Sequence, residues 1–261
     1  MSIWTLVGIG INAAILMMVV VWYIAKRLNN AGYVDAAWSY GFTFVIAVFA
    51  LAGSGDATRK LVLAAMVAVW SLRLGTHILL RLLKHHPAED PRYAELREMF
   101  PKRPWFMFFG FFQLQAILIG ILSIPFAISA SNPAPALNPW EIAGVILFAV
   151  AFLGEIVADA QLAAFKRNSA NAGKVCDAGL WRYSRHPNYF FEWLIWVAFF
   201  LYTLGSPHGW VGIISPLLML VFLTKVTGIP PAEAQSLKSR GDAYRDYQRR
   251  TSAFVPWIPR T

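Results

Sequence analysis

The stretch GLWRYSRHPNYFFE, residues 179–192, places two arginines, a histidine, an asparagine and a glutamate directly before a long apolar run, residues 193–224. In a membrane, a glutamate at the head of such a run is costly unless it meets a polar partner or a ligand. Arg182, Arg185 and His186 suit an anion, and a helix that starts after Pro187 would add free backbone N–H groups. The stretch is therefore either a functional site or a basic loop that only obeys the positive-inside rule.

The composition indicates an integral membrane protein. Of 261 residues, 57% are hydrophobic and only 14% are charged, which is too little polar surface for a soluble globule. The uncharged residues 2–25, followed by Lys26 and Arg27, fit a spanning helix better than a cleaved signal peptide. The net charge of +9 is dispersed among apolar runs, so we expect membrane lipids and a phosphorylated ligand as partners, and no nucleic acid.

Hydropathy predicts an all-α fold, a single transmembrane domain over residues 1–261. A span needs about 20 apolar residues, and turn signals at 131–135 and 205–209 divide the two longest runs. Lysine and arginine gather in the loops 83–104 and 165–187 and in the tail after residue 229, with Arg59 and Lys60 as an exception. The positive-inside rule then puts the N-terminus outside and the C-terminus in the cytoplasm. The seven expected helices lie near 3–25, 34–53, 60–83, 105–129, 140–165, 188–204 and 209–228.

Two polar segments predict helices on the membrane surface. The first follows the cap signals of residues 87–93 and runs over 94–100. The second opens at residues 230–233 and continues to about Thr251. Both would cover a cytoplasmic opening.

Ionisable residues recur inside the expected spans. Each costs about 2.5–3.5 kcal/mol at the centre of a span, so a set this large implies a shared polar cavity. Glu155, Asp159 and Lys166 fall on one helix face, and Asn188 and Glu192 are one turn apart. The alternative is that these residues only pair with one another and pin helices together. The set comprises Asp35, Arg73, His77, Glu155, Asp159, Glu192 and Lys225.

The sequence offers no pattern for a metal site. His85 and His86 have no third ligand at metal spacing, and Cys176 alone can form neither an internal disulfide nor a cysteine-based zinc cluster. Residues 8–13 match a Gly-x-Gly-x-x-Ala pattern, but they lie inside the first span and follow no strand, so we discard a dinucleotide fingerprint.

Several motifs in one order resemble the steroid 5-alpha-reductase family, in particular its bacterial DUF1295-type branch. They are residues 179–192, the Glu155-x-x-x-Asp159-x-Gln161 element and the ending from Tyr244 to Trp257. The resemblance implies a seven-helix membrane oxidoreductase, monomeric, in a bacterial cytoplasmic membrane. It implies NADPH held on the cytoplasmic side without a Rossmann fold, and reduction of an activated C=C bond in a lipophilic enone such as a Δ4-3-keto steroid.

The resemblance also implies residue roles. Residues 1–130 would receive the substrate, with Asp35 as the acid. The family tyrosine of the third span has no counterpart here, which leaves His77 or Tyr33 as substitutes, and Phe191 stands where relatives often have glycine. Residues 140–261 would hold NADPH, through Glu155, Asp159, Lys166, Arg182, Tyr183, Arg185, His186, Asn188, Glu192, Tyr244 and Tyr247.

Two other classes compete with reduction. Isoprenylcysteine and phospholipid methyltransferases also end in an Arg-His-Pro-x-Tyr element with a downstream glutamate, and they bind S-adenosylmethionine. A non-catalytic lipid or sterol binder is the third class. The face of Glu155, Asp159 and Lys166, together with Asp35, favours reduction because it gives a cofactor as long as NADPH a place to lie.

Overall fold

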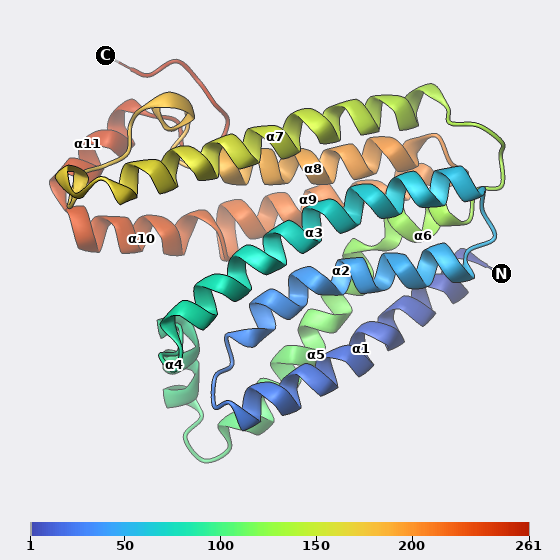
Figure 1. Ribbon diagram of the computed structural model, residues 1–261, viewed down its shortest axis with the longest axis horizontal. Helices are drawn as coiled ribbons and strands as arrows, with labels where there is room; N and C mark the ends of the chain where they lie inside the picture. Colours follow the sequence, from blue (N-terminus) through green and yellow to red (C-terminus); the bar gives the residue numbers. More distant parts are fainter. Residues whose placement is uncertain (1, 261) are drawn as a thin grey trace. The chain divides into compact units, whose positions relative to one another are not determined.

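A computed structural model describes residues 2–260, and within them every regular element is helical (Figure 1). The only β-type contact of this part of the chain is an isolated bridge between Ser184 and Ser252. The all-α prediction is confirmed. The longer helices are α1 Ile3–Arg27, α2 Tyr33–Ala52, α3 Ala57–His85, α4 Pro91–Met99, α5 Pro104–Leu122, α6 Ile124–Ala130, α7 Pro139–Arg167, α8 Pro187–Leu204, α9 Ile214–Val221, α10 Ile229–Arg240 and α11 Asp242–Arg250.

Six helical stretches of the described chain are long and apolar enough to cross a membrane, which indicates an integral membrane protein. The seventh expected span exists as α8, but α8 is not among the six. Its 18 residues begin with Pro187 and Asn188 and include Glu192, which lower its hydropathy. The six are α1, α2, α3, α5, α7 and the continuous stretch Gly209–Arg240, in which α9 is apolar and the final part, α10, is polar.

Two expected helices are interrupted. The span expected over 105–129 breaks at Ser123 into α5 and α6, because Pro125 has no N–H to donate and its ring crowds the preceding turn. The tail helix, expected to run unbroken to about Thr251, breaks at Gly241 into α10 and α11. Gly241 has a φ of 52°, a left-handed conformation that glycine adopts without strain.

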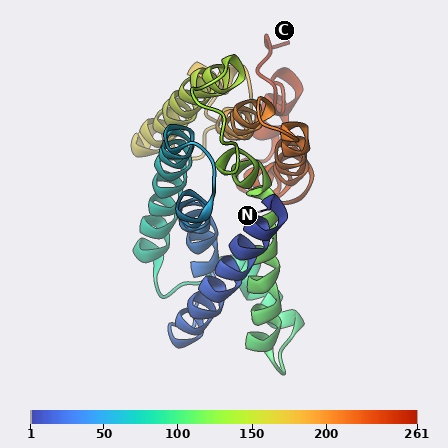
Figure 2. The same ribbon diagram turned by 90° about the vertical axis from the view of Figure 1, so that its right-hand side faces the viewer.

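The chain divides into two compact units, and the first comprises Met1–Asn138 and Thr203–Gly212. In it α1 packs against α2 and α5, and α2 packs against α3; both views show α1 beside α5 (Figures 1 and 2). Large rings fill the interior, with Phe42, Trp70, Phe108 and Phe112 fully buried. The apolar faces of these helices pack together because the contact removes their side chains from polar surroundings.

The exception to the charge rule at Arg59 has a structural explanation. Arg59 is 1% exposed at the start of α3, and its guanidinium donates to the backbone carbonyls of Asn132, Ala134 and Ala136 at 3.0, 2.6 and 2.7 Å. Lys60 Nζ donates to the Gly53 carbonyl at 2.8 Å. Backbone carbonyls of loops therefore bind both cations. The positive-inside rule counts the charges in each loop and does not take such hydrogen bonds into account.

The second unit comprises Pro139–Tyr202 and Ile213–Thr261. Its helices α7 and α8 lie side by side, and the views agree (Figures 1 and 2). A side chain on Gly144 would meet the backbone of Tyr202 at 2.7 Å, and one on Gly154 would meet the Phe191 ring at 2.4 Å. Since residue 144 faces 202 and residue 154 faces 191, the two helices run antiparallel and approach closely at these glycines.

Candidate functional site

Asp35 stands in the first turn of α2 and is held by two donors from α4. Tyr93 Oη donates to Asp35 Oδ1 at 2.6 Å, and Arg92 Nη2 donates to Asp35 Oδ2 at 2.9 Å. The Asp35 side chain keeps 28% of its exposure, whereas Tyr93 is only 3% exposed. The carboxylate is therefore paired, and it still reaches a cavity of about 410 Å³ that Arg81, His85 and Glu89 also line.

Helix α4 is fixed to the turn between α1 and α2 by a second ion pair. Glu89 accepts from Arg97 Nη2 at 2.9 Å and from the Ala31 backbone N–H at 2.7 Å. Burial and the Asp35 carboxylate raise the pKa of Tyr93 well above its ordinary value, so the phenol keeps its proton. The first unit thus holds a protonated hydroxyl against a carboxylate, and that carboxylate lines a cavity.

The two substitutes predicted for the proton donor lie elsewhere. His77 is exposed on α3, and Tyr33 is half-buried at the start of α2. Among the described residues no hydrogen bond joins Asp35 to either side chain. In this structure Tyr93 and Arg92, and not His77, contact the Asp35 carboxylate. A role for His77 in proton donation stays a prediction.

Four of the expected cofactor residues lie on the α7–α8 pair. Glu155 is 4% exposed and Glu192 7% exposed, and Glu192 Oε1 accepts from the Trp196 indole at 3.0 Å. Asn188, in the first turn of α8, has a buried Oδ1 without a hydrogen-bond donor among the described residues. An unsatisfied buried carbonyl costs about 1–3 kcal/mol, so Asn188 is suited to accept from a bound N–H group. Asp159 follows Glu155 by one turn of α7.

Lys166 lies eleven residues beyond Glu155, about 16 Å along α7 at the usual helical rise. It lines a cavity of about 230 Å³ together with Lys174 and Arg240. The loop is fixed there because Arg240 Nε donates to the Lys174 carbonyl at 3.0 Å. Three cations around one cavity make it a candidate phosphate site. Within residues 2–260, no group of three or more His, Cys, Asp or Glu side chains is placed to hold a metal ion.

Arg185 and His186 contact a glutamate that the sequence did not single out. Glu233 of α10 accepts from Arg185 Nε at 2.7 Å and from His186 Nε2 at 3.3 Å, while Gln248 donates to its other oxygen at 2.7 Å. Burial opposes the charge on Glu233, but the hydrogen bonds from His186 and Arg185 outweigh it and lower its pKa to about 2. Arg185 and His186 therefore tie the C-terminal tail to the segment before α8.

The two expected tail tyrosines are buried in the second unit. Tyr247 is 2% exposed, and its hydroxyl donates to the backbone carbonyl of Trp181. Burial raises the pKa of Tyr244 to about 12. Arg182 and Tyr183 are exposed, and a contact of either with a cofactor stays a prediction.

Tyr93, Arg92 and Glu233 are residues of these clusters that sequence reasoning missed. Tyr93 and Arg92 follow the Asp90-Pro91 cap signal, which predicts only a surface helix. Glu233 belongs to a pattern that predicts only the start of the tail helix. Each finds its partner more than 40 residues away, and single-sequence patterns carry no signal for such pairs.

The family described as "Protein of unknown function (DUF1295)" matches residues 21–251. The chain belongs to this family. The DUF1295 family is related to steroid 5-alpha-reductase-like proteins. No solved structure matches the chain.

Two proteins are similar to this DUF1295 member, and the two similarities extend over very different lengths of the chain. An uncharacterized protein of Schizosaccharomyces pombe is 25% identical over 281 residues, covering 95% of this chain and 79% of that protein. A probable O-methyltransferase of Ustilaginoidea virens, ustE, is 42% identical over 52 residues, which cover 20% of this chain and 18% of that protein. The first similarity extends over nearly the whole chain, and the second is confined to a short segment.

Proposed function

We propose that the protein is an NADPH-dependent membrane oxidoreductase that reduces an activated C=C bond of a lipophilic enone, such as a Δ4-3-keto steroid. The observation that carries the proposal is the buried Oδ1 of Asn188, an acceptor in need of a donor, one helical turn before Glu192 on α8. The relation of the DUF1295 family to steroid 5-alpha-reductase-like proteins supports the same chemistry.

The residues of the second unit fit a long, phosphorylated cofactor. Asn188 would accept a hydrogen bond from an amide N–H, and Lys166, Lys174 and Arg240 would bind phosphate at the C-terminal end of α7. NADPH supplies a hydride when bound. Arg185 is left out of this assignment, since Glu233 and backbone carbonyls take up its Nε and Nη1.

The acid is assigned to the first unit, where Asp35 and Tyr93 form a hydrogen-bonded pair. In this structure Tyr93 Oη donates its hydrogen to Asp35 Oδ1, and Arg92 keeps Asp35 oriented. The hydroxyl would polarise a substrate when a ketone oxygen replaces Asp35 as its acceptor. A proton held at such a position stabilises the charge that develops on a ketone oxygen as its enone is reduced. Tyr93 thereby takes the place that the sequence left to His77 or Tyr33.

We further propose seven spans, with α8 as the sixth in chain order, the N-terminus outside and the tail in the cytoplasm. The distribution of lysine and arginine supports this orientation. The substrate would enter from the bilayer, and the protein would act as a monomer in a bacterial cytoplasmic membrane.

A binding experiment tests the cofactor. Purified protein in detergent is incubated with NADPH or with labelled S-adenosylmethionine, and the retained ligand is measured. We expect NADPH to be retained, and Asn188→Leu to weaken its binding about tenfold, the loss of one hydrogen bond to a buried acceptor. Asn12→Leu is the matched control, because Asn12 only donates to the Gly8 carbonyl within α1. Unchanged affinity in Asn188→Leu would remove the assignment.

Methyl transfer is the second candidate, and the 52-residue similarity to a probable O-methyltransferase favours it. The Asn188 acceptor could equally receive the ammonium group of S-adenosylmethionine. Retention of labelled S-adenosylmethionine, with no retention of NADPH, would establish this class in place of reduction.

A further inference from the structure

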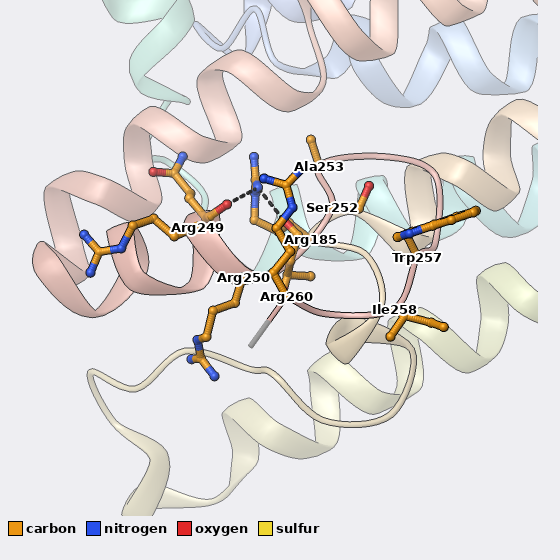
Figure 3. Close-up of a pocket in the computed structure, with 10 residues that line it drawn as sticks. Arg185, Arg249, Arg250, Ser252, Ala253, Trp257, Ile258 and Arg260 are labelled. Atoms are coloured by element: carbon orange, nitrogen blue, oxygen red, sulfur yellow. Dashed lines mark hydrogen bonds between the residues drawn. The ribbon is translucent and has the colours of Figure 1, made fainter.

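The second unit contains a pocket rich in arginine that the proposed reaction does not use. It has a volume of about 370 Å³ and lies between the end of α11 and the C-terminal segment (Figure 3). Four of its ten lining residues are arginines and none is acidic: the arginines are Arg185, Arg249, Arg250 and Arg260. Arginine side chains around a concave site whose lining contains no acidic residue favour an anionic ligand.

Two of these guanidinium groups are directed into the pocket. In Figure 3 the side chains of Arg185 and Arg260 run toward the same region, whereas Arg249 and Arg250 point outward. The outward pair has carboxylate partners, since Arg249 contacts Asp246 and Arg250 lies 3.8 Å from Asp177.

The inward pair keeps donors available. Arg185 uses Nε for Glu233 and Nη1 for the carbonyls of Gln248 and Thr251, so no hydrogen bond among the described residues uses its Nη2. Arg260 donates its backbone N–H to the Arg250 carbonyl at 2.8 Å. Its side chain has no ion pair with any described residue. Two guanidinium groups with open N–H donors match the oxygens of a phosphate.

One side of the pocket is apolar and exposed. Trp257 is 71% exposed and Ile258 77% exposed, and both line the pocket. This segment is fixed beside the residues that precede α8, because the Trp257 N–H donates to the Tyr183 carbonyl at 2.9 Å and the Arg185 N–H donates to the Ser252 carbonyl at 2.8 Å. The pocket thus lies next to the point where an apolar helix begins.

We propose that this pocket binds the phosphate of an anionic phospholipid headgroup. Exposed tryptophan beside arginine is the composition of the membrane–water interface, where indole rings sit among headgroups and basic side chains attract anionic lipids. A water-soluble phosphate would gain nothing from Trp257 and Ile258. The lipid would hold the C-terminal segment against the bilayer surface.

The test measures lipid binding without NADPH. The thermal midpoint of the full-length protein in neutral detergent is followed during titration with short-chain phosphatidylglycerol, short-chain phosphatidylcholine or inorganic phosphate. We expect phosphatidylglycerol to raise the midpoint more than the other two. Arg260→Gln and Trp257→Ala should each weaken the apparent affinity at least fivefold. Arg245→Gln is the matched control, since Arg245 is an exposed arginine of α11 paired with Asp242 outside the pocket.

The other outcomes overturn the proposal. Equal responses to phosphatidylglycerol and phosphatidylcholine, or an unchanged response in Arg260→Gln, would show that the pocket has no headgroup site. An equal response to inorganic phosphate would identify a site for soluble phosphate. Weaker NADPH binding by Arg260→Gln, with lipid binding intact, would assign the pocket to the nucleotide. Failure of the oxidoreductase proposal leaves this measurement unaffected, because no nucleotide takes part in it.

Discussion

Asp35 is the residue on which the proposed proton donation depends. Asp35→Asn keeps an oxygen for the Tyr93 hydroxyl but loses the charge that Arg92 neutralises. We expect it to retain NADPH binding and to reduce enone reduction about 100-fold, the scale expected for a positioned acid. Tyr93→Phe should cause a comparable loss of rate. Cofactor titration and single-turnover NADPH oxidation with a Δ4-3-keto steroid measure the two effects separately.

The control for this pair is Glu95→Gln, a change at an exposed carboxylate of the same helix α4 that has no ion pair with any described residue. It should leave both measurements unchanged. If Asp35→Asn and Tyr93→Phe reduce thermal stability but leave the rate intact, the pair only anchors α4 to α2.

Glu233 predicts a dependence of stability on pH. Its pKa is about 2 in the folded protein against an ordinary value of 4.5. A lowered folded pKa means that its stabilisation is complete above about pH 4.5 and disappears as the pH falls toward 2. The contribution is at most about 3 kcal/mol. Thermal unfolding of wild type and Glu233→Gln should therefore differ most above pH 4.5 and converge at lower pH. A difference that is constant with pH would contradict this role.

At this scale the sequence predicted residues better than partners. Asp35 and Glu192 could be singled out from the sequence because burying an acidic side chain of an apolar run in the membrane costs free energy, whatever its final partner. Which donor satisfies Asp35 depends on how α4 folds back over 58 residues, and no local pattern encodes that distance. Arg185 and His186 looked like an anion site for the same reason, yet Glu233, 47 and more residues later, already satisfies them.

The contact between α7 and α8 depends on small residues. A Cβ at Gly144 would lie 2.7 Å from the Tyr202 backbone nitrogen and 2.9 Å from the Ala198 carbonyl oxygen, and neither atom can move without its helix. We expect Gly144→Ala to destabilise the protein by about 1–3 kcal/mol, the usual cost of overpacking. Gly8→Ala on α1 is the matched control, since nothing lies within 4 Å of its Cβ position. Equal melting temperatures of the two variants in detergent would contradict the close contact.

Helices were the most predictable elements of the chain. The apolar runs predicted the first and last residues of α1, α2, α3 and α7 to within a few positions, because a run of about 20 apolar residues is typical of a spanning helix. The breaks were harder to foresee. Pro125 divides α5 from α6 although the hydropathy continues across it, and Gly241 divides α10 from α11 inside an unbroken polar pattern. Composition averages over a window and so does not register a single residue that stops a helix.

At the scale of the whole chain, α8 decides the side of the membrane on which the tail lies. If α8 crosses, seven spans place the tail opposite the N-terminus. If it does not, the tail and the N-terminus share one side. Helix α8 is the one expected span that is absent from the six apolar stretches of the described chain. Its 18 residues are sufficient to cross only if Asn188 and Glu192 sit at the interface or meet a ligand.

Cysteine labelling in intact cells distinguishes the two topologies. The native Cys176 is buried, which raises the pKa of its thiol, and Cys176→Ser removes it. In that background we introduce His208→Cys in the turn after α8 and Ala243→Cys in α11, both at exposed positions. With seven spans, an impermeant maleimide should label residue 208 in intact cells and residue 243 only after permeabilisation. Ala134→Cys and Ala170→Cys are the controls, because they precede α8 and keep their sides in both arrangements. Labelling of residue 243 in intact cells, with residue 208 protected, would show that α8 does not cross and would place the arginine-rich tail outside.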